Sequence, residues 1–286
     1  MWIATTFMHR AGLFKGVLHG GRERATLTIM LQQTVIQRQE VVCRTRNESG
    51  MQTPALFVHG AGSEKDIWLF VSHYVAEKLP DKPLLLLDLP GHGDSEPPGR
   101  QSIESYAAVV TEFLQANRLG PVDIIGHSMG GLIAQAAALA QPQLVRKLCL
   151  AATGARLKVL PLIFELLPEQ TEAFFSNMQQ FAFGPSIERK LAEKVIDRMR
   201  HLDPLTIRGD FVACDAFDAR ARLSEIFAPT LVVAGDQDLL APAKINRKLA
   251  DGLPFARYVE LAETGHMIPL ERPRELAERL CEHFEA

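Results

Sequence analysis

The chain has 286 residues, and 47% of them are hydrophobic, which suffices for one large core or for a domain with a sizeable insertion. A formal net charge of −3, with lysines and arginines scattered along the chain, excludes an obvious nucleic-acid surface. No run of 18 apolar residues occurs, so we expect no membrane span. The four cysteines lie far apart and predict neither a zinc site nor a redox motif. We expect a cytoplasmic protein that is a monomer or a homodimer.

Residues 1–29 show no pattern that continues into the rest of the chain. A signal peptide is not expected, because no basic segment precedes the apolar residues and His9, Arg10 and Lys15 interrupt them. We expect this extension to be disordered or loosely docked, and a working start at Met30 is an alternative.

From about residue 31 the sequence alternates short apolar runs with stretches of helical spacing. In chain order the pattern predicts strands at 34–38, 40–46 and 55–58, a helix at 67–79, a strand at 84–87, a helix at 102–115, a strand at 122–125, a helix at 129–140 and a strand at 147–151. It resumes with a strand at 230–234, a helix at 242–253, a strand at 256–261 and a helix at 269–284. Between these blocks, helical patterns occur without a convincing strand.

This alternation predicts an α/β fold with a mostly parallel, doubly wound sheet that is covered by helices on both faces. Residues 30–153 and 228–286 would form the core, and residues 154–227 an inserted helical cap.

Ser128 lies in Gly126-His127-Ser128-Met129-Gly130, where a predicted strand becomes a predicted helix. On such a sharp turn a serine hydroxyl projects above the sheet, and the glycines avoid collisions around it. The helix N-terminus that follows favours a developing negative charge. Ser128 is therefore a candidate nucleophile, and a plain helix N-cap is the alternative.

A nucleophilic serine needs a base, an acid that orients the base, and donors for an oxyanion. His266 follows the last predicted strand and is the best base; Asp236 and Asp238 follow the strand at 230–234, and both are candidate acids. Met129 would supply one N–H donor. The other would come from Ala61 in the glycine loop after the strand at 55–58, unless that loop is only a tight turn.

These residues together resemble the α/β-hydrolase superfamily, in its serine-nucleophile branch of esterases, C–C hydrolases and haloperoxidase-like proteins. The resemblance runs from about residue 31 to the C-terminus and is weakest in 154–227. It rests on four ordered motifs: His59-Gly60-Ala61-Gly62, Asp88-Leu89-Pro90-Gly91-His92-Gly93-Asp94-Ser95, Gly126-His127-Ser128-Met129-Gly130, and Gly235-Asp236-Gln237-Asp238 with Gly265-His266. It favours Asp238 over Asp236 as the acid, and it implies a Ser128–Asp238–His266 triad in the expected chain order.

The resemblance implies acyl transfer without a metal or organic cofactor, and neither glycine loop has the third glycine of a dinucleotide fingerprint. We expect hydrolysis of a small-molecule ester with a small-to-medium hydrophobic acyl group. C–C bond or lactone hydrolysis on the same triad is an alternative, and a weakly catalytic receptor is another. His127 leans toward an esterase, because relatives that cleave C–C bonds often carry Asn there. The candidate substrate contacts are Gly60, His127, Trp68, Phe164, Phe174, Phe175 and Met267.

Overall fold

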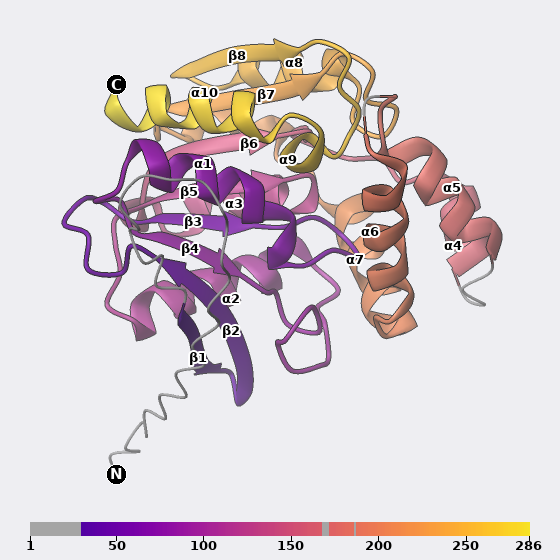
Figure 1. Ribbon diagram of the computed structural model, residues 1–286, viewed down its shortest axis with the longest axis horizontal. Helices are drawn as coiled ribbons and strands as arrows, with labels where there is room; N and C mark the ends of the chain where they lie inside the picture. The colour runs from indigo at the N-terminus through magenta and orange to yellow at the C-terminus, as the bar shows by residue number, and fades with distance from the viewer. Residues whose placement is uncertain (1–29, 168–171, 186) are drawn as a thin grey trace, which may run out of the picture.

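The computed structural model describes residues 30–286 apart from 168–171 and 186. Its centre is an eight-stranded sheet with the order β1-β2-β4-β3-β5-β6-β7-β8 (Figure 1). The pairs β1/β2 and β2/β4 are antiparallel, and the other five pairs are parallel. The strands are β1 (Met30–Ile36), β2 (Gln39–Arg46), β3 (Ala55–Val58), β4 (Leu84–Leu87), β5 (Val122–His127), β6 (Val145–Ala151), β7 (Thr230–Gly235) and β8 (Ala256–Leu261).

Helices cover both faces of this sheet, which is why its central strands are buried along their whole length. Every residue of β3, β4, β5 and β7 is buried. The helices α1 (Leu69–Lys78) and α10 (Pro273–Glu285) pack together in one hydrophobic cluster, whereas α2 (Ile103–Ala116), α3 (Met129–Ala140) and α8 (Ala243–Gly252) belong to the other. The predicted α/β fold class is confirmed.

Several boundaries differ from the predicted ones, and three of the differences have a local cause. β1 ends at Ile36, because Gln37 and Arg38 form a two-residue turn with φ of 51° and 68°. Such turns usually carry Asn or Gly, so Gln-Arg gave no signal. The helix predicted at 67–79 begins as the 3₁₀ helix η1 (Lys65–Trp68) before α1. The last helix is split into α9 (Ile268–Glu271) and α10, because the residue before Pro273 leaves the helical region.

Between β6 and β7 the described residues form helices and no strand. They are the short 3₁₀ helix η4 (Arg220–Glu225) and the helices α4 (Pro161–Leu166), α5 (Glu172–Ala182), α6 (Arg189–Arg200) and α7 (Pro204–Ala216). The helices α4 to α7 lie together at one end of the sheet (Figure 1) and share a hydrophobic cluster of their own. We call them the cap helices. The exact limits of a cap domain stay a prediction.

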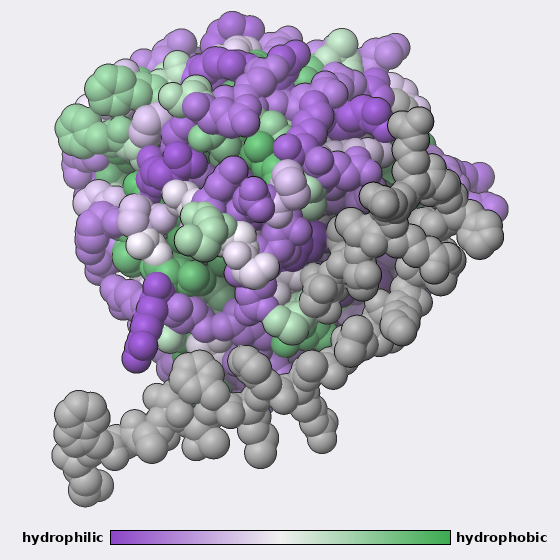
Figure 2. Space-filling model, turned by 60° about the vertical axis from the view of Figure 1, so that its left-hand side comes forward, coloured by the Kyte–Doolittle hydropathy of each residue, from purple (hydrophilic) through white to green (hydrophobic). Residues whose placement is uncertain are grey.

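Large hydrophobic side chains that reach the surface are scattered. On the face shown in Figure 2, hydrophilic residues predominate and hydrophobic ones form small separate groups. Isolated exposed apolar residues are normal for a folded protein. In the part of the chain that the structure describes, no helix is both long enough and apolar enough to cross a bilayer. All four cysteines are buried free thiols.

Candidate active site

Ser128 lies at the junction of β5 and α3, with φ of 53° and ψ of −117°. A residue with a side chain rarely adopts such a conformation, and it stores strain of the kind found at functional sites. The Ser128 side chain makes no capping hydrogen bond to α3. Its backbone is held instead, because Ser128 N–H donates to Ala151 O at 2.9 Å and Thr153 Oγ1 donates to Ser128 O at 2.9 Å. The geometry fits a nucleophile elbow rather than a plain N-cap.

The glycines on either side of Ser128 are required by close approach of the backbone. A Cβ added to Gly126 would lie 2.2 Å from Gly130 O, and a Cβ added to Gly130 would lie 2.3 Å from Val58 O. Both distances are far inside van der Waals contact. Any side chain at either position would therefore push α3 away from β5 or β3 and move Ser128 with it.

His266 meets Asp238 and not Asp236. His266 Nδ1 lies 2.9 Å from Asp238 Oδ2, while Asp238 Oδ1 accepts the N–H groups of Leu240 and Ala241, both at 2.8 Å. Burial works to raise the pKa of Asp238, but the attraction of His266 and these hydrogen bonds outweigh it and hold the pKa below its usual value. Asp236 is exposed and accepts the N–H of Thr264. Asp238 is therefore the ionised partner that can orient the His266 ring.

A cavity of about 210 Å³ brings Ser128, His266 and Ala61 together under the cap helices, and we call it the catalytic cavity. Two amide groups beside it are free to hold an oxyanion. Among the hydrogen bonds of the described residues, none uses the N–H of Ala61 or of Met129 as its donor. Charge that develops on a substrate oxygen between these donors would meet fixed dipoles rather than mobile water.

His127 supports His266 through the backbone. Its Nε2 donates to His266 O at 2.8 Å, and the residue is 2% exposed. Burial first, and then the neighbouring His266, lower the pKa of His127 to about 3, so its ring is neutral. The sequence placed His127 next to the nucleophile but gave no sign of this contact, which joins residues 139 positions apart.

The expected substrate contacts divide into two groups. Gly60, His127 and Met267 line the catalytic cavity. Trp68, Phe164, Phe174 and Phe175 do not line it, and their contact with a substrate stays a prediction.

The reasons are visible in the packing. Trp68 is fully buried in the core, 5.3 Å from the Phe57 ring. Phe174 and Phe175 stack edge to face at 5.1 Å inside the cluster of the cap helices. Phe164 follows the cavity-lining Ile163 on α4, and neighbouring side chains on a helix diverge.

Other apolar residues, mostly from the cap helices, form the walls of the catalytic cavity: Leu157, Val159, Leu160, Ile163, Met178, Phe181, Ala182, Phe183, Val195, Ile196, Met199, Phe211, Cys214, Leu239, Leu240 and Ala241. Lys158 also lines it, but its Nζ is engaged by Asp215 at 3.0 Å. The spacing of Ile196 and Met199 on α6 was the available sequence signal.

Buried polar residues shape the loop that carries Ala61. His59 Nδ1 donates to Gly60 O at 2.8 Å, and His59 Nε2 accepts the N–H of Leu89 at 3.1 Å. Gly62 N–H donates at 2.8 Å to Oδ2 of Asp210, which lies on the cap helix α7. No local sequence pattern indicated Asp210, because one carboxylate within a helix is usually solvated.

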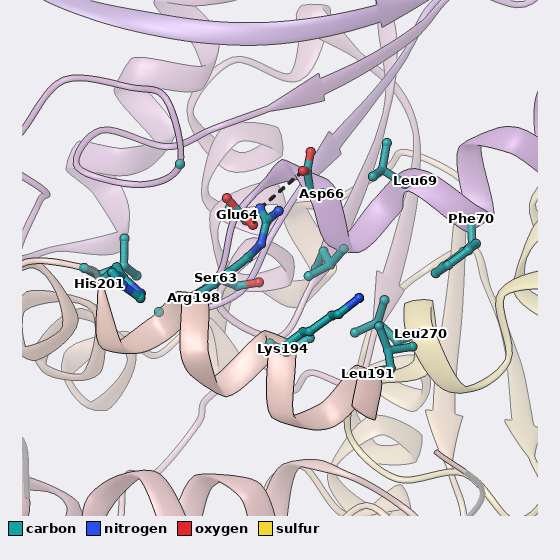
Figure 3. Close-up of a pocket in the computed structure, with 15 residues that line it drawn as sticks. Ser63, Glu64, Asp66, Leu69, Phe70, Leu191, Lys194, Arg198, His201 and Leu270 are labelled. Atoms are coloured by element: carbon teal, nitrogen blue, oxygen red, sulfur yellow. Dashed lines mark hydrogen bonds and ion pairs between the residues drawn. The ribbon is translucent and has the colours of Figure 1, made fainter. Parts of the chain in front are cut away.

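A larger cavity of about 400 Å³ lies on the other side of α6, and we call it the outer cavity (Figure 3). It shares Gly62, Ser63 and Val195 with the catalytic cavity but includes neither Ser128 nor His266. At its rim Arg198 pairs with Glu64 and, at 3.3 Å, with Asp66. In the described part of the chain, no group of three or more His, Cys, Asp or Glu side chains is placed to hold a metal ion.

Comparison with known proteins agrees with this geometry. Residues 55–279 match the model of the alpha/beta hydrolase family. A pimeloyl-(acyl-carrier protein) methyl ester esterase of Chromobacterium violaceum is 29% identical, over 82% of this chain and 96% of its own. A protein of Azorhizobium caulinodans named for carbamate hydrolysis is 30% identical, over 78% of this chain and 88% of its own. A solved thermophilic esterase is 27% identical, with a TM-score of 0.77 over 90% of this chain and 98% of that one. The chain belongs to the alpha/beta hydrolase family, as its motifs predicted.

Proposed function

We propose that this protein is a serine hydrolase that cleaves carboxylic esters with small-to-medium hydrophobic acyl groups. One observation carries the proposal: Ser128, held at a positive φ, shares an apolar cavity with His266, whose Nδ1 is hydrogen-bonded to the buried Asp238. Similarity to an esterase of Chromobacterium violaceum and to a solved esterase structure supports the same class of reaction.

In the proposed mechanism His266 accepts the proton of Ser128 as its Oγ attacks the ester carbonyl. The N–H groups of Ala61 and Met129 hold the oxyanion of the tetrahedral intermediate. His266 then gives the proton to the departing alcohol, which leaves an acyl group on Ser128. Water, activated by His266, hydrolyses the acyl-enzyme and restores the serine. Asp238 stays ionised throughout and stabilises the imidazolium.

The acyl preference follows from the size and polarity of the catalytic cavity. Its volume of about 210 Å³ lies below the range of about 300–1,000 Å³ that is usual for drug-sized ligands. Its walls are predominantly apolar, and its one lysine is already paired with a carboxylate. A short or medium aliphatic acyl chain meets both conditions, whereas a charged acyl group would lose its hydration without finding a partner.

The test is hydrolysis of a p-nitrophenyl ester series, from acetate to decanoate, by the wild type and by Ser128→Ala. We expect turnover with an optimum at short or medium chains, and a fall in kcat of about four to six orders of magnitude in Ser128→Ala. Unchanged activity in Ser128→Ala would refute the mechanism. No turnover by a folded wild type would refute the ester substrate and favour C–C or lactone hydrolysis, or a receptor.

A further inference from the structure

We propose that Asp210, on the cap helix α7, is a positioning residue that sets the orientation of the oxyanion donor at Ala61. The inference rests on the proposed function, because it assigns to a cap residue a part in the same reaction. Asp210 does not line the catalytic cavity and would not touch the substrate. It would act through the backbone of the loop that follows β3.

Asp210 accepts hydrogen bonds from three separate segments of the core. It is fully buried, and its Oδ2 accepts both the Gly62 N–H and His92 Nε2, each at 2.8 Å. Its Oδ1 accepts the Tyr106 hydroxyl at 2.6 Å. A carboxylate with three short hydrogen bonds and no solvent has one available position. One side chain on α7 thereby holds three parts of the core by hydrogen bonds: the loop after β3, the loop after β4 and the helix α2.

His92 forms an ion pair with Asp210. Its Nδ1 lies 3.0 Å from Pro90 O and its Nε2 lies 2.8 Å from Asp210, so both ring nitrogens face oxygen atoms, an arrangement that favours hydrogen on both. Burial works against a charged ring, but the attraction of Asp210 outweighs it, and the pKa of His92 is raised. Asp210 therefore binds Gly62 as a carboxylate whose charge is balanced inside the protein.

Two successive peptide groups around Ala61 are fixed by this arrangement. The Gly60 carbonyl belongs to the same peptide group as the Ala61 N–H, and His59 Nδ1 holds that carbonyl at 2.8 Å. Because the two groups of a trans peptide point in opposite directions, the Ala61 N–H is directed away from His59. The next peptide group ends in the Gly62 N–H, which Asp210 holds. With both planes fixed, the dihedral angles of Ala61 have little freedom.

Gly62 is the residue that permits the second contact. Its φ is +61°, a conformation that favours glycine, and a Cβ at this position would lie 2.9 Å from Met199 Cε on α6. The loop therefore runs close to the cap helices with its N–H turned toward α7. The cap contributes a hydrogen bond to the oxyanion loop as well as walls to the cavity.

The experiment compares Asp210→Asn with a matched variant, Asp123→Asn, in the full-length protein. Asp123 is also a buried carboxylate, paired with Lys82 at 2.7 Å and Arg146 at 2.5 Å, but it lies at the start of β5, away from Ser128. Both variants should lower thermal stability. Only Asp210→Asn should lower kcat, by about tenfold to a hundredfold, since losing one oxyanion donor outright costs about 10²–10³-fold. KM should change by less than about threefold.

A transition-state analogue separates positioning from general damage. A trifluoromethyl ketone forms a tetrahedral oxyanion on the serine, so its Ki should rise in Asp210→Asn by the same factor as kcat falls, and stay constant in Asp123→Asn. Tyr106→Phe removes one hydrogen bond from Asp210 without changing a charge and should show the same pattern at a few-fold size. This variant decides the question if Asp210→Asn does not fold.

The inference is overturned if Asp210→Asn or Tyr106→Phe, corrected for the folded fraction, keeps the kcat and Ki of the wild type. It is also overturned if the loss falls on KM alone. Ser128→Ala is measured in the same assay to separate the two proposals. If Ser128→Ala retains activity, the proposed function has failed; if it is inactive while Asp210→Asn is fully active, only the role of Asp210 has failed.

Discussion

The two cavities on either side of α6 share part of a wall but differ in volume, in charge and in the side chains they contain. The catalytic cavity is the smaller, at about 210 Å³, is mainly apolar, and contains Ser128 and His266. The outer cavity holds about 400 Å³ and has charged residues at its rim, including Lys194 and Arg198 (Figure 3). The larger cavity contains neither Ser128 nor His266. The proposed site therefore rests on the convergence of a strained serine, a base and free N–H donors rather than on size.

Replacing Asp238, which orients His266 in the catalytic cavity, should have the largest effect on kcat after Ser128→Ala. Asp238→Asn keeps the shape of the side chain but permits the wrong tautomer of His266, so kcat should fall by about 10⁴-fold. Asp236→Asn, two residues away and exposed, should keep kcat within about twofold. The measurement is steady-state hydrolysis of the preferred p-nitrophenyl ester. Equal losses in both variants would contradict the assignment of the acid.

The two faces of α6 offer a sharper test of which cavity holds the acyl chain. Ile196→Ala enlarges the catalytic cavity, so the preferred ester should lengthen by one or two carbons, with a loss of stability of about 2–5 kcal/mol. Leu191→Ala, on the face toward the outer cavity, is the matched control and should leave the preference unchanged. The readout is kcat/KM across the ester series. A change in the preferred ester in Leu191→Ala alone would indicate that the acyl chain binds in the outer cavity.

The buried pair of His92 and Asp210 behind the catalytic cavity predicts a pH dependence of stability. Because the pKa of His92 is raised on folding, its contribution is complete below about 6.5, the unfolded value, and is lost as pH rises through the folded pKa. In that window the stability advantage of the wild type over His92→Gln should shrink by up to about 1.4 kcal/mol per pH unit. Urea unfolding at several pH values measures it. A pH-independent difference would show that His92 is neutral.

Arg198 at the rim of the outer cavity should matter least. Its side chain is 60% exposed, and exposed ion pairs are worth about 0–1 kcal/mol. Arg198→Ala should therefore change the free energy of unfolding by less than about 1 kcal/mol and leave kcat/KM for a neutral ester unchanged within about twofold. Thermal unfolding and the ester assay check this. A large loss of activity would mean that the outer cavity takes part in the reaction.

The sequence predicted best what short-range chemistry determines. The bounds of β3, β4, α3 and β8 were predicted to the residue. The apolar run of β4 ends directly before Asp88, and α3 ends shortly before Pro142. The motif around Ser128 was equally readable, since a Cβ added at Gly126 would lie only 2.2 Å from Gly130 O and the position admits only glycine. Where the fold leaves no room for a side chain, the sequence has glycine.

The same method failed in the cap, for a physical reason. Its helices carry apolar residues on the side that packs against other helices and on the side that lines the cavity, so composition does not separate Phe174 from Phe181. Long-range polar contacts were equally hidden. The bond from Gly62 to Asp210 spans 148 positions, and that from His127 to His266 spans 139. Neither leaves a local pattern, because each depends on how separate elements pack.

The hydrogen bond between α7 and the glycine loop bears on how the protein could acquire new substrates. Substitutions in α5 or at the cavity-facing positions of α6 change the walls around Ser128 without touching the carboxylate that holds Gly62. Substitutions that shift α7 change the walls and the loop together. Directed evolution toward new esters should therefore randomise α5 and α6 and keep the sequence around Asp210 fixed. A cap transplanted from a relative should retain kcat only if it brings a carboxylate to the position of Asp210.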